Sequence, residues 1–231
     1  MIINRQLIGQ NFHSMLLGMG ENYTLTQTNG EPYTGKISIV AKTASSYMMG
    51  EREYLMNGVA TFPSVEAQRT FRGCYFAREI APDRTYIMVS TVPKDTTPYV
   101  AEIYAIGCNA TVSLAYFRQS KNEKGDLVVK PEVYAENVEV YIDSTLQKQR
   151  RSSDGNFDQT LYYMQIPAKY SVAQDEVVLY KMPRYNEKTK QHEWITTNFR
   201  VEAVDTSMSS IDADGNVYGI LDVQMTIDTR G

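Results

Sequence analysis

The sequence is poor in the residues that build most catalytic and metal sites. Its 231 residues include only two histidines, His13 and His192. Neither has a neighbour in the patterns that a metal site or a Ser/His/Asp triad requires. The glycine- and nucleophile-containing signatures of dinucleotide, phosphate-loop and hydrolase sites are also missing. We therefore predict that the protein is not an enzyme and that it has no catalytic residue, no metal site and no cofactor.

Cysteine is equally scarce. Cys74 and Cys108 are the only two, and neither belongs to a CxxC or Cys/His cluster. Isolated cysteines of this kind are typical of buried free thiols, which is the interpretation we favour. A disulfide between the two is the alternative.

Long apolar runs and an excess of basic residues are absent as well. No run approaches the 18 residues that a membrane-spanning helix needs, and the first twelve residues lack the pattern of a signal peptide. We expect no membrane partner and a protein that is made and used in the cytoplasm. The net charge of −4 argues against a basic nucleic-acid footprint. This net charge is compatible with a protein that surrounds DNA without binding it tightly.

The patterns that are present predict a mainly β fold. Residues 1–20 are the exception, because apolar residues at helical spacing predict a helix there: Ile8, Phe12, Met15 and Leu16. Alternating and β-rich runs then predict two modules, each a β-barrel or β-sandwich, over 21–119 and 120–231. The polar stretch 120–126 is the predicted break between them. The last strand is the clearest, with Leu221, Val223, Met225 and Ile227 on one face.

Two segments resemble each other in layout. Residues 85–114 and 198–227 each contain a strand-like run, then a polar connection, then a second strand-like run. The first runs are Tyr86–Thr91 and Phe199–Val204. Identity between the segments is low, but the shared layout favours two β modules in tandem.

Several loops are candidates for contacts with other molecules. Lys148, Arg150 and Arg151 form the one concentrated basic spot, and we interpret it as an exposed loop, an acidic-partner contact or a contact with DNA phosphates. Residues 43–70 are predicted to be a long loop with a short helix near 64–70, and 184–193 a charged loop. The candidate interface residues in these stretches or next to them are aromatic or methionine: Tyr47, Met48, Met49, Tyr54, Tyr185 and Trp194.

One further motif invites a metal interpretation. Asp212, Asp214, Gly215 and Asn216 match part of a calcium-binding loop, but a third oxygen donor and the closing glutamate are missing. We predict a hairpin turn.

Short motifs resemble the structural proteins of the head–tail connector of tailed bacteriophages. They are Tyr86–Ser90, Ile106–Val112, the pair Arg200–Asp205 and Gly219–Val223, and the opening Asn4–Gly9, together less than a third of the chain. The resemblance implies a non-enzymatic virion protein, assembled in the bacterial cytoplasm, that forms a homo-oligomeric ring below the portal. Portal or adaptor proteins, tail proteins and double-stranded DNA, bound without sequence specificity, would be its partners. Another tail or baseplate component, or a ligand-binding β-sandwich, is the alternative.

Overall fold

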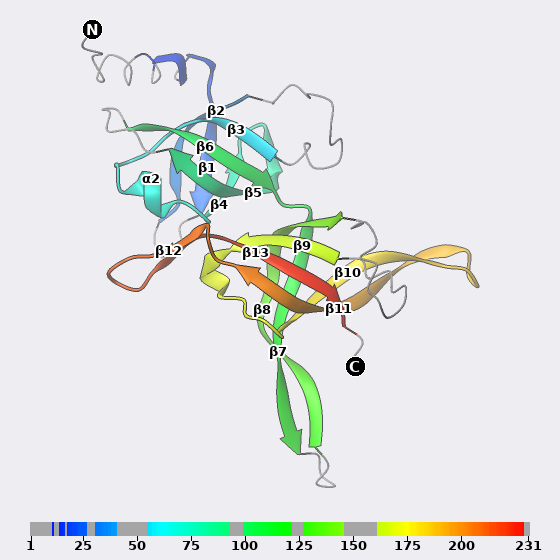
Figure 1. Ribbon diagram of the computed structural model, residues 1–231. Helices are drawn as coiled ribbons and strands as arrows, with labels where there is room; N and C mark the ends of the chain where they lie inside the picture. Colours follow the sequence, from blue (N-terminus) through cyan, green and yellow to red (C-terminus); the bar gives the residue numbers. More distant parts are fainter. Residues whose placement is uncertain are drawn as a thin grey trace, which may run out of the picture. The chain divides into compact units, whose positions relative to one another are not determined.

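The part of the chain that the structure describes folds mainly into β-strands, as a computed structural model shows (Figure 1). The structure describes residue 11 and residues 14–16, 18–26, 31–40, 55–92, 99–121, 127–145 and 161–228. Two compact units are present. Unit 1 contains residues 1–108, 167–169 and 207–220, and unit 2 contains residues 109–166, 170–206 and 221–231. No helix among the described residues has the length and apolar character needed to cross a membrane.

Unit 1 contains a closed barrel of six strands. Around the barrel the strand order is β1-β2-β3-β6-β5-β4, and antiparallel pairing of β4 with β1 closes it. The strands are β1 (Glu21–Thr26), β2 (Tyr33–Val40), β3 (Leu55–Thr61), β4 (Tyr75–Arg78), β5 (Ala81–Val92) and β6 (Val100–Gly107). The short helix α2 (Ala67–Thr70) lies between β3 and β4.

Unit 2 contains a second closed barrel. Its strand order is β11-β10-β7-β8-β9-β13, closed by antiparallel pairing of β11 with β13. A short strand, β12, pairs with the other end of β13. The elements after residue 108 are β7 (Ala110–Lys121), β8 (Leu127–Thr145), β9 (Leu161–Pro167), the 3-10 helix η1 (Ala168–Tyr170), β10 (Val177–Asn186), β11 (Gln191–Asp205), β12 (Ser209–Ile211) and β13 (Val217–Ile227). Of these, β12, residues 167–169 and the first residues of β13, 217–220, belong to unit 1.

The two barrels have the same topology. Numbered by their position along the chain, the six strands of each barrel follow the order 1-2-3-6-5-4. The runs Tyr86–Thr91 and Phe199–Val204 lie in the fifth strands, β5 and β11. Each fifth strand pairs antiparallel with the sixth strand of its barrel, β6 or β13. The similar layout of the two sequence segments therefore corresponds to equivalent strands.

Aromatic rings fill the barrel of unit 1. Tyr23 is fully buried, and its ring contacts Tyr33 and Phe76 edge-on at centroid distances of 6.0 and 5.9 Å. Its hydroxyl donates a hydrogen bond of 2.7 Å to the Thr61 carbonyl, so the one polar atom of the ring is satisfied. Burial raises the pKa of Tyr23 well above its usual value. Phe71, from the turn after α2, packs against Tyr33 at 5.6 Å and continues this core to the barrel end.

Aliphatic side chains dominate the second barrel. Val138, Val140, Val178 and Met164 are buried, and Phe199 is fully buried with the Tyr162 ring 4.8 Å away.

The predicted face of the last strand is confirmed in part. Leu221, Val223 and Met225 are buried, as their alternation indicates. Ile227 is 51% exposed and Thr226 is buried, contrary to the prediction. The strand ends at Ile227, opposite Phe199 of β11, so the alternation stops at the barrel rim.

Other expectations are confirmed or corrected. The short helix near 64–70 is present as α2, but 43–70 is not one loop, because β3 lies within it. The predicted break at 120–126 lies between β7 and β8, which pair up to Lys121 and Leu127, and the two units instead divide after residue 108. A polar, glycine-containing stretch marks a hairpin as readily as a domain boundary.

The predicted N-terminal helix is described only in pieces. Asn11, residues 14–16 and residues 18–19 have helical backbone, and the rest of 1–17 lies outside the described residues. Leu16 is fully buried, while Met15 is 41% exposed. Gly20 N–H donates to the Leu16 carbonyl at 2.8 Å, in the i to i−4 pattern of a helix.

The two cysteines do not form a disulfide, and the prediction of two buried thiols is confirmed for one of them. Cys74 is buried and Cys108 is partly exposed.

Two glycines in unit 1 allow a close approach of backbones. Gly73 has φ of +77°, and a Cβ added there would lie 2.0 Å from the Gly219 carbonyl oxygen. Gly219 has φ of +90°, and Gly219 N–H donates to the Arg72 carbonyl at 2.9 Å. Arg72 also donates from its guanidinium to the Met208 carbonyl at 2.8 Å. The segment 207–220 is thus held by backbone contacts that any side chain at Gly73 would block.

We predict that Gly73→Ala lowers the free energy of unfolding by about 3 kcal/mol or more, because strain at positive φ adds to a clash with backbone. Gly215→Ala is the matched control: its φ is +84°, but an added Cβ would meet nothing within 4 Å. There we expect a loss of about 1 kcal/mol. Urea unfolding measures both, and equal losses would contradict the close approach.

Candidate interaction surface

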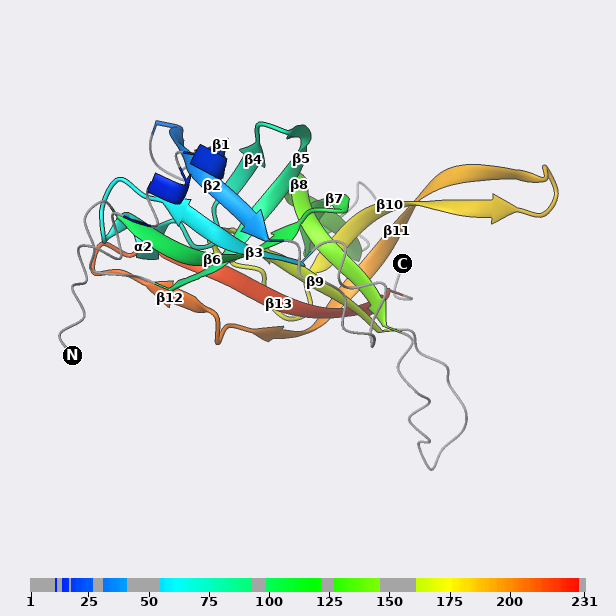
Figure 2. The ribbon, with the colours of Figure 1, turned by 90° about the horizontal axis from the view of Figure 1, so that it is seen from above.

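Two strands of unit 2 extend beyond its barrel as a two-stranded ribbon, the β10–β11 arm (Figures 1 and 2). β10 pairs with β7 only over Val177–Tyr180, and β11 pairs with β13 only from Phe199 onward. Beyond these contacts, residues 181–186 pair with residues 191–196, in a continuous antiparallel register. Among the described strands, none other pairs with them. The arm is therefore a hairpin with two open edges.

One face of the β10–β11 arm is aromatic and exposed. Pro183 lies opposite Trp194, and Tyr185 lies opposite His192. Side chains directly opposite each other in a ladder share a face, and alternate residues of a strand share it too. Trp194 is 73% exposed and Tyr185 48% exposed, and the Tyr185 and His192 rings are 5.3 Å apart. We call these four residues the arm patch.

The tip of the arm is held by hydrogen bonds. Asn186 Oδ1 accepts from Lys188 N–H and Thr189 N–H at 3.0 and 3.3 Å, and Asn186 Nδ2 donates to Glu193 Oε1 at 2.9 Å. Lys190 adopts φ of +57° and donates its N–H to the Asn186 carbonyl at 2.8 Å. The predicted charged loop at 184–193 is thus the end of a hairpin. The patch is positioned by a rigid turn on one side and by the barrel on the other.

A second ribbon, the β7–β8 arm, leaves the same barrel (Figure 1). The Tyr116 and Tyr134 rings stack at its base, with centroids 6.1 Å apart and an interplanar angle of 22°. Tyr134 donates a 2.7 Å hydrogen bond to Glu176 Oε2, which also accepts from Ala173 N–H. Burial, with this hydrogen bond to Glu176, raises the pKa of Tyr134. The base of the arm is therefore fixed to the connection before β10.

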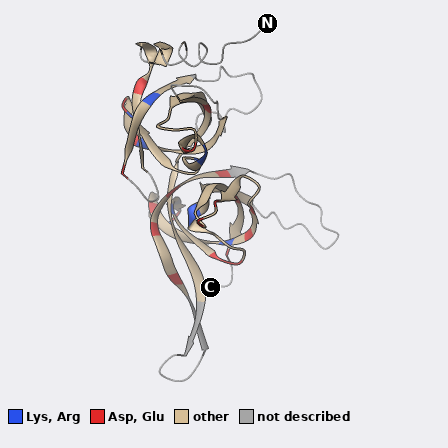
Figure 3. Ribbon diagram, turned by 90° about the vertical axis from the view of Figure 1, so that its left-hand side faces the viewer, with Lys and Arg blue, Asp and Glu red and all other residues tan. Residues whose placement is uncertain are grey.

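Acidic residues recur along β8, and Figure 3 colours all acidic residues of the described chain red. They are Glu132, Glu136, Glu139 and Asp143, and all four are at least partly exposed. Like charges at this density repel a polyanion such as DNA and reduce nonspecific sticking.

The Asp212–Asn216 motif forms a hairpin turn, as predicted, between β12 and β13. The Asp212 carboxylate accepts hydrogen bonds from Asp214 N–H, Asn216 N–H, the Asn216 amide and the Tyr218 hydroxyl. These bonds, above all the one from Tyr218, lower the pKa of Asp212 to about 2. Among the described residues, no group of three or more His, Cys, Asp or Glu is placed to hold a metal ion.

Asp212 gives the unfolding free energy a defined pH dependence. Its pKa is lower in the folded chain, so the stabilisation is present above the ordinary value near 3.8 and is lost as pH falls through about 2. We predict that the stability difference between the wild type and Asp212→Asn shrinks as pH falls from about 4 to about 2. Denaturant unfolding across this range measures it, with Asp214→Asn as the control. A difference that is constant with pH would show that the charge of Asp212 is not involved.

The structure brings together two of the predicted interface residues. Tyr185 and Trp194 lie on the same face of the arm. The sequence analysis did not include Pro183 and His192, although their period-2 spacing from Tyr185 and Trp194 was a detectable signal. Tyr47, Met48, Met49, Tyr54, Lys148, Arg150 and Arg151 lie outside the described residues.

No protein-family model, curated protein or solved structure matches this chain.

Proposed function

We propose that this protein is a non-enzymatic structural component of a tailed-phage virion that forms a ring at the head–tail junction around the DNA channel. The observation on which this rests is the β10–β11 arm with its exposed patch. The motif resemblance supports it, since Tyr86–Ser90, Arg200–Asp205 and Gly219–Val223 lie in the equivalent fifth and sixth strands of the two barrels. Portal or adaptor proteins and tail proteins are the proposed neighbours, in a virion assembled in the bacterial cytoplasm.

The physics of the arm favours a partner on its aromatic face. A two-stranded ribbon is marginally stable alone in water, and a cluster of exposed aromatic residues is typical of a protein interface. Trp and Tyr are the side chains that contribute most to binding free energy at such interfaces. Pro183 has no N–H to offer at the open edge of β10, which disfavours extension of the sheet by another strand. The remaining way for the arm to bind a partner is through its aromatic face.

A ring supplies such a partner. In a head-to-tail arrangement, a surface on one subunit contacts a different surface on the next, and the contacts close when the rotation between subunits closes. An arm that extends past its own barrel suits this arrangement. The partner of the arm patch is therefore proposed to be a second copy of the chain.

The charge pattern agrees with a channel role. The chain carries a net charge of −4, and acidic residues recur along β8. DNA passing through a channel must slide without binding tightly, and like charge on the wall prevents binding.

We predict that Trp194→Ala weakens self-association of the full chain about 30-fold or more, because truncation of a buried interface tryptophan costs about 2 kcal/mol or more. Light scattering and native mass spectrometry over a concentration series measure it. Ile211→Ala is the matched control, since Ile211 is 71% exposed but lies on β12, which is not part of the arm. Both variants should keep the unfolding free energy within about 0.5 kcal/mol of the wild type. Equal association of both variants would remove the arm from the interface.

The virion assignment is tested by copy number. Quantitative mass spectrometry of density-purified particles should find this chain at roughly six to twelve copies per particle, as one cyclic ring requires. Several tens of copies would favour another tail or baseplate component. Absence from particles would contradict a virion role altogether.

A further inference from the structure

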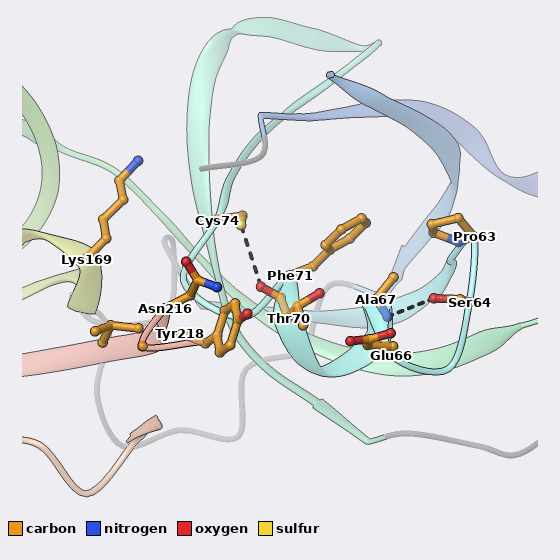
Figure 4. A pocket seen from close by; sticks show the side chains of 12 residues that line it. Pro63, Ser64, Glu66, Ala67, Thr70, Phe71, Cys74, Lys169, Asn216 and Tyr218 are labelled. Carbon is orange, nitrogen blue, oxygen red and sulfur yellow. Dashed lines mark hydrogen bonds between the residues drawn. The ribbon is translucent and has the colours of Figure 1, made fainter. Parts of the chain in front are cut away.

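Unit 1 contains a pocket of about 510 Å³ that the proposed assembly does not use (Figure 4). Its lining residues come from the α2 region, from the turn before β13 with the first two residues of β13, and from Lys169 of η1, and all of them belong to unit 1. The volume lies in the range of small-molecule sites. The floor is part of the barrel core, because Phe71 and Cys74 are only 5% and 6% exposed.

One wall of the pocket is held rigid by a single carboxylate. Asp212 binds the Tyr218 hydroxyl and the Asn216 amide nitrogen, the latter at 3.0 Å. The orientation of the Tyr218 ring is thereby fixed, and Figure 4 shows it beside Thr70 and Phe71. A fixed ring in a pocket wall offers an apolar face at low entropic cost.

The other walls provide both hydrogen-bond donors and hydrogen-bond acceptors. The hydrogen bond to Asp212 is the main cause that raises the pKa of the Tyr218 hydroxyl to about 12, and the charge of Glu66 adds a small contribution. Glu66 lies at the start of α2 and is exposed. Thr70 provides a hydroxyl, and Lys169 provides an ammonium group whose Nζ lies 5.2 Å from the centroid of the Tyr75 ring. The carboxylate accepts hydrogen bonds, the ammonium donates them and the hydroxyl does both. Because the charges of Glu66 and Lys169 are opposite, a ligand with charge of a single sign would be attracted by one and repelled by the other.

We propose that this pocket binds a neutral saccharide of one or two pyranose rings. A pyranose ring has an apolar C–H face that can lie on the Tyr218 ring. Its hydroxyl groups each donate and accept, which matches Glu66, Thr70 and Lys169. This binding activity goes beyond the structural role proposed above and does not depend on it.

Saturation-transfer NMR on the full chain with maltose, lactose and N,N′-diacetylchitobiose tests the proposal. We expect transfer to the ring protons of at least one disaccharide. Glu66→Ala should raise its Kd about tenfold, the effect of losing one hydrogen bond to a charged group. Glu31→Ala is the matched control, because Glu31 is exposed and does not line the pocket, and its Kd should equal that of the wild type.

Val217→Trp provides a second variant that fills the pocket from its wall, with circular dichroism to confirm the fold. It should abolish transfer, and if it does not fold, Glu66→Ala still decides the question. No transfer to any of the three disaccharides, or equal affinity of Glu66→Ala and Glu31→Ala, would overturn the proposal.

The ligand in the cell is either a free sugar or the terminus of a surface glycan. A biosensor that carries the bound disaccharide immobilised through its reducing end distinguishes the two. Unchanged affinity indicates the terminus of a surface glycan, and lost affinity indicates a free sugar. Because these measurements use purified chain alone, their outcome is independent of the particle copy number.

Discussion

Closure of the two barrels is the constraint on which the rest of the structure depends. Pairing of β4 with β1 and of β11 with β13 leaves no open edge within either ring of strands. A closed sheet removes the unpaired N–H and C=O groups that lead to uncontrolled association. A six-stranded barrel is also narrow enough for side chains to fill it, here with the rings around Tyr23 in one barrel and with valines around Phe199 in the other. Open edges are then found in the strands that extend past the barrel.

The two barrels share one topology but differ in the surfaces that project from them. Both barrels follow the order 1-2-3-6-5-4, yet they differ in the length of their strands. No strand of the first barrel is longer than 12 residues, whereas in the second barrel β8 has 19 residues and β11 has 15. The extra residues form the arms of unit 2. One scaffold thus serves as a compact barrel in one unit and as a base for projecting surfaces in the other, which is the usual relation between a fold and the sites added to it.

Hydrogen bonds to single side chains fix the irregular parts. Asp212 holds the turn before β13, Asn186 holds the tip of the β10–β11 arm, and Glu176 holds the base of the β7–β8 arm. Each of these side chains accepts more than one hydrogen bond, so a single residue replaces the regular pairing that the ladder supplies elsewhere. The exposed aromatic patch and the pocket wall both lie next to such residues. Their geometry is therefore set by local polar contacts as well as by the barrels.

The sequence by itself determined the fold class, most of the strands and the presence of two modules, because period-2 alternation and turn residues act locally. It also identified Tyr185 and Trp194 as candidate interface residues, and the Asp212 turn. It misplaced the break at 120–126, since a hairpin and a domain boundary have the same local composition, and it missed β3 inside 43–70. Only the tertiary structure decided barrel closure, the division after residue 108 and the assignment of residues 207–220 to unit 1. These features depend on pairing between strands far apart in the chain, such as β11 with β13, and no local pattern encodes which distant partner a strand will find.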